Sequence, residues 1–156
     1  MITVQRPGQE SIQIESILLD FEGTLATDRR VHPKAKDKIN LLSKRTKIFI
    51  FTTGEKEVVL NALRNVKAEI IFLRDGNASR DKMDLLKRLG ADRTVAIGNG
   101  VDDVSVIEAA ALGMAVMGKE GMAAEVSARA DVVFKDILDA LDFLLKPLRQ
   151  KATLTK

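Results

Sequence analysis

The sequence predicts an α/β fold with a mainly parallel central sheet. Short apolar runs of strand length alternate with segments in which apolar residues recur at helical spacing, the pattern of such folds. The chain of 156 residues has the length of one folded unit. Neither a repeat nor a low-complexity linker interrupts it. We therefore expect one domain over residues 1–156.

The first elements are an expected hairpin and a buried strand. Met1–Gln5 and Ser11–Ile14 flank the turn pair Pro7-Gly8 and predict a small N-terminal β-hairpin within residues 1–14. The apolar run Ser16–Phe21 predicts the first strand of the sheet. Pro33 suits the first turn of a helix that extends to about Arg45.

The later elements repeat the strand–helix alternation, and Gly90 and Pro147 end helices. Further strands are expected at Lys47–Phe51, Glu69–Leu73, Thr94–Ile97, Met114–Met117 and Val132–Phe134. Further helices are expected at Glu55–Val66, Arg80–Leu89, Asp102–Leu112, Glu120–Arg129 and Ile137–Leu145. A basic tail, residues 147–156, follows.

The composition excludes several classes of site. The chain has no Cys, which rules out disulfides, thiolate metal sites and cysteine nucleophiles, and its single His rules out zinc sites with several imidazoles. The net charge of +3 and the absence of Tyr and Trp argue against nucleic acid. No apolar run has the length of a membrane span, so we expect a cytoplasmic protein with no membrane partner.

Two acidic segments follow predicted strands. Asp20 and Glu22 come directly after the run Ile17–Leu19, and Gly98–Asp103 follows the strand that ends near Ile97. Ligands of α/β sheets bind at the carboxyl ends of parallel strands, and carboxylates and carbonyls are the ligands that Mg²⁺ prefers. Each segment alone is also compatible with an acidic turn or a capped helix.

A hydroxyl and an ammonium group complete the set. Thr52, Thr53 and Gly54 end the second expected strand, and Lys82 lies near the start of the third helix. Such groups can hydrogen-bond a phosphoryl group and neutralise its charge. The order of Asp, Thr, Lys and Asp at one sheet edge is more specific than any member alone.

These motifs resemble the haloacid dehalogenase (HAD) superfamily, particularly its small soluble proteins similar to the phosphorylation domain of P-type ATPases. The likeness extends from Ile17 to about Leu148 and is strongest at Ile17–Leu25 and Ala96–Asp103. It implies a Rossmann-like three-layer sandwich. The intervals from Thr24 to Thr52 and from Gly54 to Lys82 have no room for a cap domain.

The resemblance also implies a role for each residue of the set. Asp20 would be the nucleophile that forms an aspartyl-phosphate, and Glu22 would bind Mg²⁺ through its carbonyl and act as the acid/base. Lys82 would pair with the nucleophile and the phosphate. Either Thr52 or the Thr53-Gly54 pair would hold a phosphoryl oxygen.

The metal shell departs from the family pattern in one respect. Asp103 would help to bind Mg²⁺, together with Asp20 and the Glu22 carbonyl. Asn99 stands where many relatives carry Asp, and Asp102 where many carry Asn. This exchange keeps polar ligands at both positions.

The leading hypothesis is a Mg²⁺-dependent phosphohydrolase. The alternative is a weakly active or non-enzymatic binding or regulatory protein, because Glu22 replaces the usual second Asp and its extra methylene can misplace the carboxyl group. A phospho-receiver module is disfavoured, since its acidic pair precedes the phosphorylated Asp. The open site suits a large phosphorylated substrate or a protein, and the hairpin at residues 1–14 offers edges for a homo-oligomer.

Overall fold

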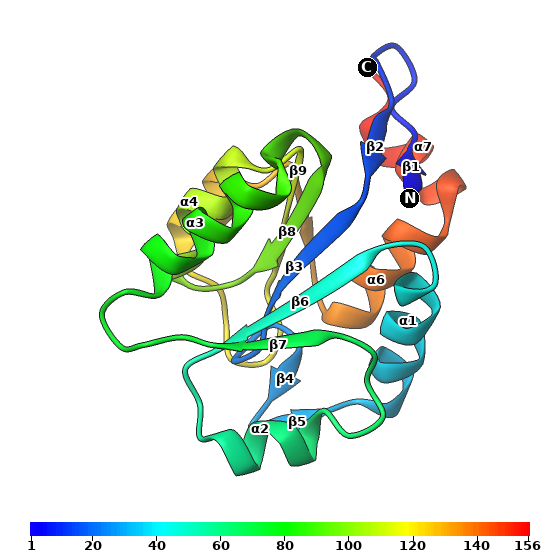
Figure 1. Cartoon of the computed structure of the whole chain (residues 1–156). Coiled ribbons are helices and arrows are strands. Elements are labelled where there is room, and N and C mark those ends of the chain that lie inside the picture. Colours follow the sequence, from blue (N-terminus) through cyan, green and yellow to red (C-terminus); the bar gives the residue numbers. More distant parts are fainter.

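A six-stranded parallel sheet with the order β10-β9-β8-β3-β6-β7 forms the centre of the fold (Figure 1). The computed structural model describes residues 1–156. Every neighbouring pair of strands in this sheet is parallel, as the sequence predicts. Its strands are β3 (Ser16–Asp20), β6 (Lys47–Thr52), β7 (Glu69–Phe72), β8 (Thr94–Gly98), β9 (Leu112–Val116) and β10 (Val132–Phe134).

Helices cover both faces of the sheet and produce three layers (Figure 1). The helices α1 (Pro33–Ser43) and α6 (Ile137–Leu145) lie on one face, and α3 (Ala78–Leu89), α4 (Val104–Ala109) and α5 (Ala124–Arg129) lie on the other. Successive side chains of β3 point to opposite faces of the sheet. Ile17 and Leu19 therefore belong to the apolar cluster on one face, and Leu18 belongs to the cluster on the other. No helix is both long and apolar enough to cross a membrane.

The two chain ends pack beside one another (Figure 1). β1 (Ile2–Val4) and β2 (Ile12–Ile14) form the expected antiparallel hairpin. The expected basic tail is instead largely a helix, α7 (Pro147–Leu154), because Pro147 occupies its first turn. The buried Gln150 of this helix accepts the Gln5 N–H at 2.9 Å and donates to the Phe143 carbonyl at 2.8 Å.

Two other parts of the chain differ from the expectation. The helix expected at Asp102–Leu112 is a short 3-10 turn (Val101–Asp103) followed by α4, and Leu112 already begins β9. A side chain at Gly113 would lie 2.2 Å from the Ile107 carbonyl oxygen, so glycine allows β9 to start directly beneath α4. The helix expected from Glu120 begins only at Ala124.

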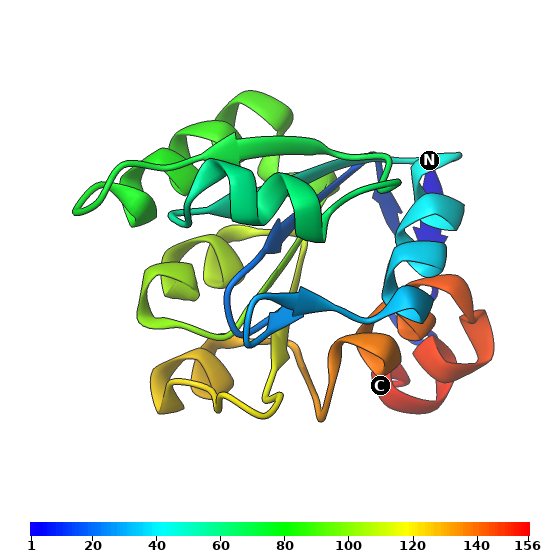
Figure 2. The same cartoon turned by 90° about the horizontal axis from the view of Figure 1, so that it is seen from below.

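A second hairpin lies at the carboxyl end of the sheet and was not expected from the sequence. β4 (Ala26–Thr27) and β5 (Arg30–Val31) pair antiparallel between β3 and α1. The helix α2 (Lys56–Ala62) lies beside this hairpin (Figure 2). The remaining 3-10 turn, Ala91–Arg93, connects α3 to β8. As expected, no cap domain is inserted between Thr24 and Thr52 or between Gly54 and Lys82.

Candidate active site

The predicted site residues come together at the carboxyl ends of three adjacent strands. β3 lies between β6 and β8, with Asp20 opposite Phe51 and Leu19 opposite Ile97. Asp20 therefore ends its strand beside Thr52, the last residue of β6. Figure 2 looks onto this edge of the sheet, with the β4–β5 hairpin in front.

The loops that follow these strands depend on glycine. Gly23 has φ +75°, and a side chain there would lie 2.3 Å from the Asn99 amide nitrogen. A side chain at Gly98 would lie 2.3 Å from the Asp103 carboxyl carbon. The two glycines thus allow the loops after β3 and β8 to approach one another and the acidic side chains.

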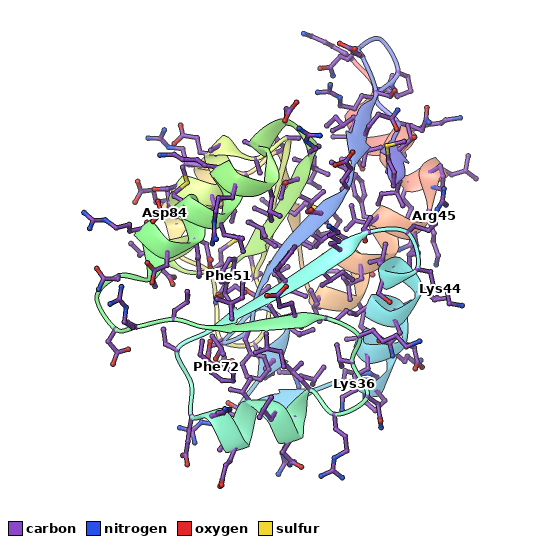
Figure 3. The ribbon with its side chains drawn as sticks, in the orientation of Figure 1. Lys36, Lys44, Arg45, Phe51, Phe72 and Asp84 are labelled. Atoms are coloured by element: carbon purple, nitrogen blue, oxygen red, sulfur yellow. The ribbon has the colours of Figure 1, made fainter.

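Lys82 is the central residue of the site. Its ammonium group lies 3.0 Å from Asp20, 2.9 Å from Asp102 and 2.6 Å from Asp103. Only 1% of the Lys82 side chain is exposed, because it lies on the inner face of α3, whereas Asp84 of the same helix points outward (Figure 3). The ammonium has three protons to donate, so each carboxylate can accept one.

This cluster carries more negative than positive charge. Burial, together with the negative charge of Asp103, raises the pKa of Asp20 well above its ordinary value despite Lys82. Burial likewise raises the pKa of Asp103. Burial alone would lower the pKa of Lys82, but the charges of Asp20, Asp103 and Asp102 outweigh it and raise that pKa. One cation does not offset three carboxylates, so the site favours a further positive charge.

Backbone and hydroxyl groups orient the two buried carboxylates. The second oxygen of Asp103 accepts the N–H groups of Asn99 and Gly100, each at 3.1 Å. The Thr24 hydroxyl lies 3.0 Å from the Asn99 side-chain oxygen and 3.4 Å from the second oxygen of Asp20. Thr24 was not among the predicted site residues, although its place directly after Gly23 in the turn that follows β3 could have indicated it.

Thr52 and Glu22 contact each other above the end of β6. The Thr52 hydroxyl accepts the Gly54 N–H at 2.9 Å and donates its own proton to the Glu22 carboxylate. Thr52 is buried, whereas Thr53 is exposed and its side chain makes no such contact. Of the two hydroxyls, Thr52 is therefore the one that contacts a predicted site residue, Glu22.

Three carboxylates of the cluster fit a divalent metal ion. Asp20, Asp102 and Asp103 each offer an oxygen, and these atoms lie within 4.8 Å of one another. Hard oxygen ligands of this kind suit Mg²⁺. Asn99 lies at the border of this group, where its side chain contacts Thr24 and the Gly121 carbonyl at 3.1 Å. The Glu22 carboxylate does not belong to the group, so Glu22 can contribute its backbone carbonyl at most.

Two small cavities adjoin the site on its open side. One, of about 350 Å³, is lined by Phe21, Glu22, Asp28, Arg29 and Glu120. The other, of about 190 Å³, lies between Arg29 and the loop Thr53–Glu55. The β4–β5 hairpin thus contributes to the entrance of the site.

No family model matches the sequence. An uncharacterized protein of Methanocaldococcus jannaschii is 39% identical over 82 residues, which are 50% of this chain and 88% of that protein. This degree of identity and coverage places both proteins in one family.

Solved structures with low sequence identity share the fold. A Streptomyces avermitilis protein assigned to the HAD family of hydrolases has a TM-score of 0.70 at 22% identity, covering 88% of each chain. The 3-deoxy-D-manno-octulosonate 8-phosphate phosphatase of Moraxella catarrhalis, solved in complex with magnesium, phosphate and KDO, has a TM-score of 0.70 at 14% identity, covering 90% of this chain and 89% of its own. The protein thus belongs to the same family as the archaeal protein, and its fold is that of the HAD superfamily, as its sequence motifs imply.

Proposed function

We propose that this protein is a Mg²⁺-dependent phosphatase that forms an aspartyl-phosphate on Asp20. The observation that carries the proposal is the position of the Asp20 carboxylate, buried at the end of β3 between the Lys82 ammonium and the Thr24 hydroxyl. The fold supports it, because a protein of the same fold, the Moraxella catarrhalis phosphatase, binds magnesium and phosphate.

The reaction proceeds in two displacements at phosphorus. An Asp20 oxygen forms a bond to phosphorus while the bond to the leaving oxygen breaks, and that oxygen takes a proton from the Glu22 carboxyl group. A water molecule then attacks phosphorus and gives its proton to the Glu22 carboxylate. Phosphate leaves, and Asp20 is restored.

Lys82 and the metal ion counter the repulsion between Asp20 and the phosphoryl group. Lys82 supplies a buried positive charge whose distance to Asp20 is 3.0 Å. Asp20, Asp102 and Asp103 would hold Mg²⁺, which when bound neutralises charge on the phosphoryl oxygens. Thr24 keeps the Asp20 carboxylate in one orientation.

The contact between Thr52 and Glu22 connects substrate binding to acid/base chemistry. The Thr52 hydroxyl donates a hydrogen bond to the Glu22 carboxylate in this structure, and the hydrogen bond from the Gly54 N–H to the Thr52 oxygen orients that hydroxyl. A phosphoryl oxygen is an equivalent acceptor for the same proton. When it takes the place of the carboxylate, Glu22 is released toward the leaving group, where a general acid is needed.

The same contact favours the second candidate, a weakly active or non-enzymatic phosphate-binding protein. If the Glu22 carboxylate stays hydrogen-bonded to Thr52, the Thr52 hydroxyl cannot bind a phosphoryl oxygen. The same hydrogen bond then holds the acid/base, Glu22, away from the reacting atoms. A displacement of about 1 Å lowers a rate by about 10²-fold. The rate of hydrolysis therefore separates the two candidates.

The test is phosphate release from para-nitrophenyl phosphate at saturating Mg²⁺. Asp20→Asn is expected to lower turnover by at least about 10³-fold. The matched control Asp84→Asn alters an exposed residue of α3 and should leave turnover unchanged. Turnover in Asp20→Asn equal to that of the parent would contradict the assignment of the nucleophile.

Variants of Glu22 test the acid/base. Glu22→Asp shortens the side chain so that it no longer reaches Thr52 in the same way, and turnover should rise by about tenfold, or roughly 1.4 kcal/mol of barrier. Glu22→Ala should lower turnover. If Glu22→Ala hydrolyses the ester as fast as the parent, Glu22 is not the acid/base.

A further inference from the structure

The turn of the β4–β5 hairpin holds an arginine in an unfavourable backbone conformation. Asp28 has φ +50° and Arg29 has φ +65°, and the two residues form the complete loop between Thr27 and Arg30. Two consecutive positive φ angles are the pattern of a type I′ turn, whose second position normally holds glycine. Residues held in such conformations cluster at active sites and ligand-binding sites.

The Arg29 side chain belongs to the entrance of the site. It lines both the cavity of about 350 Å³ and the cavity of about 190 Å³, and Glu22 lines both with it. The second cavity also reaches Thr53 and Gly54, next to the Thr52 hydroxyl. Arg29 therefore lies beside Glu22, the residue proposed above to protonate the leaving group.

Arg29 is the only basic residue that lines these two cavities, although four acidic residues line them too: Glu22, Asp28, Glu55 and Glu120. None of the ion pairs in the molecule includes Arg29, and its side chain makes no hydrogen bond. All donors of its guanidinium are free for a ligand. Among the residues that line these two cavities, Arg29 is thus the one positive charge that an anionic ligand could contact.

We infer that Arg29 binds an anionic group on the leaving group of the substrate, a carboxylate or a second phosphate. This inference rests on the proposed phosphatase function and narrows its substrate class. The guanidinium fork matches the oxygens of either group in a bidentate arrangement. Glycine at this position would relieve the backbone but would supply no hydrogen-bond donor.

The experiment compares small phosphate esters that differ in one group. Phosphoglycolate carries a carboxylate, ethylene glycol bisphosphate carries a second phosphate, and 2-hydroxyethyl phosphate carries a neutral hydroxyl. The parent should show a higher kcat/KM for one of the two anionic esters. Arg29→Gly should lower that kcat/KM by about 10- to 100-fold by raising KM. The kcat/KM of this variant for 2-hydroxyethyl phosphate should stay within about twofold of the parent value.

Stability separates this role from a structural one. Because glycine suits the turn, Arg29→Gly should keep Tm or raise it by up to about 3 °C. The matched control is Arg30→Gln, which alters another exposed arginine of the same hairpin and should retain the preference of the parent. The anionic ester that responds most to Arg29→Gly identifies the group that Arg29 binds.

Three results would overturn the inference. The first is an equal loss of kcat/KM on all three esters in Arg29→Gly. The second is a parent that prefers neither anionic ester over 2-hydroxyethyl phosphate. The third is a loss of the preference in Arg30→Gln as large as that in Arg29→Gly. If the parent hydrolyses none of them, the phosphatase proposal fails by itself. The upward Tm shifts caused by phosphoglycolate and by ethylene glycol bisphosphate in the parent then still decide whether Arg29 binds the anion: Arg29→Gly should lose one of them, and retention of both would overturn the inference.

Discussion

Two charged clusters of this molecule are built in opposite ways. At the carboxyl edge of the sheet, one cation, Lys82, is surrounded by the three carboxylates of Asp20, Asp102 and Asp103. On α6, one carboxylate, Asp142, lies 2.6 Å from Lys38, 3.4 Å from Lys146 and 3.5 Å from Arg149.

The two clusters differ in what they do for the fold. Burial alone would raise the pKa of Asp142, but the hydrogen bond and charge of Lys38 and the charge of Lys146 outweigh it and lower that pKa. The buried carboxylates of the Lys82 cluster have raised pKa values because burial and mutual repulsion disfavour their charge. The Asp142 cluster connects α1, α6 and α7, whereas the Lys82 cluster has an excess of carboxylates that a divalent cation could offset.

The largest expected effect comes from removing the central lysine. Lys82→Met leaves the buried carboxylates without their cation, and we expect a loss of about 3–5 kcal/mol in the free energy of unfolding. Lys38→Met removes one cation of a partly exposed cluster and should cost about 0.2–1 kcal/mol. Urea unfolding of both variants gives the comparison. Equal losses in the free energy of unfolding of the two variants would show that the buried carboxylates depend on Lys82 no more than Asp142 depends on Lys38.

Metal binding should act on one cluster alone. At a Mg²⁺ concentration about 100 times Kd, binding to the folded state stabilises by about 2.7 kcal/mol, or roughly 5–10 °C in Tm. Asp103→Asn should abolish most of this shift, and Asp142→Asn should keep it. NaCl at equal ionic strength serves as the control in thermal unfolding. A shift that survives in Asp103→Asn would place the metal elsewhere.

The smallest effect concerns the Asp142 cluster and its pH dependence. Asp142→Asn should lower the free energy of unfolding by about 0.5–1 kcal/mol at pH 7. Because folding lowers the pKa of Asp142, this contribution is present above about pH 4, the pKa of an unfolded aspartate, and is lost as the pH falls through the lower folded value. Urea unfolding of the parent and Asp142→Asn at pH 7 and pH 3 measures this contribution as the difference between their free energies of unfolding. A difference that is larger at pH 3 than at pH 7 would contradict the expected pH dependence.

The sheet and the composition of the site were predictable because parallel strands place their carboxyl ends at one edge. Asp20, Thr52 and Asp103 each follow an apolar run, so the alternation of strands and helices brings them together. The inner face of α3 likewise follows from periodicity, which places Lys82 with Leu85 and Leu86.

Other features depend on contacts that periodicity does not encode. The β4–β5 hairpin has strands of two residues each and the turn pair Asp28-Arg29, which lacks the usual glycine signal. The end of α4 is determined by the packing of Gly113 against Ile107. The contact between Glu22 and Thr52 depends on a side-chain rotamer, and the sequence specifies only that the two residues lie at neighbouring strand ends.

The most direct test of the central claim is detection of the phosphorylated enzyme. The protein is incubated with radiolabelled acetyl phosphate and Mg²⁺, quenched in acid and analysed for covalent label. We expect a label that hydroxylamine removes, as for an acyl phosphate, present in the parent and in Asp84→Asn, increased in Glu22→Ala and absent from Asp20→Asn. Label that persists in Asp20→Asn, or turnover by the parent with no label even in Glu22→Ala, would contradict the claim that Asp20 accepts the phosphoryl group.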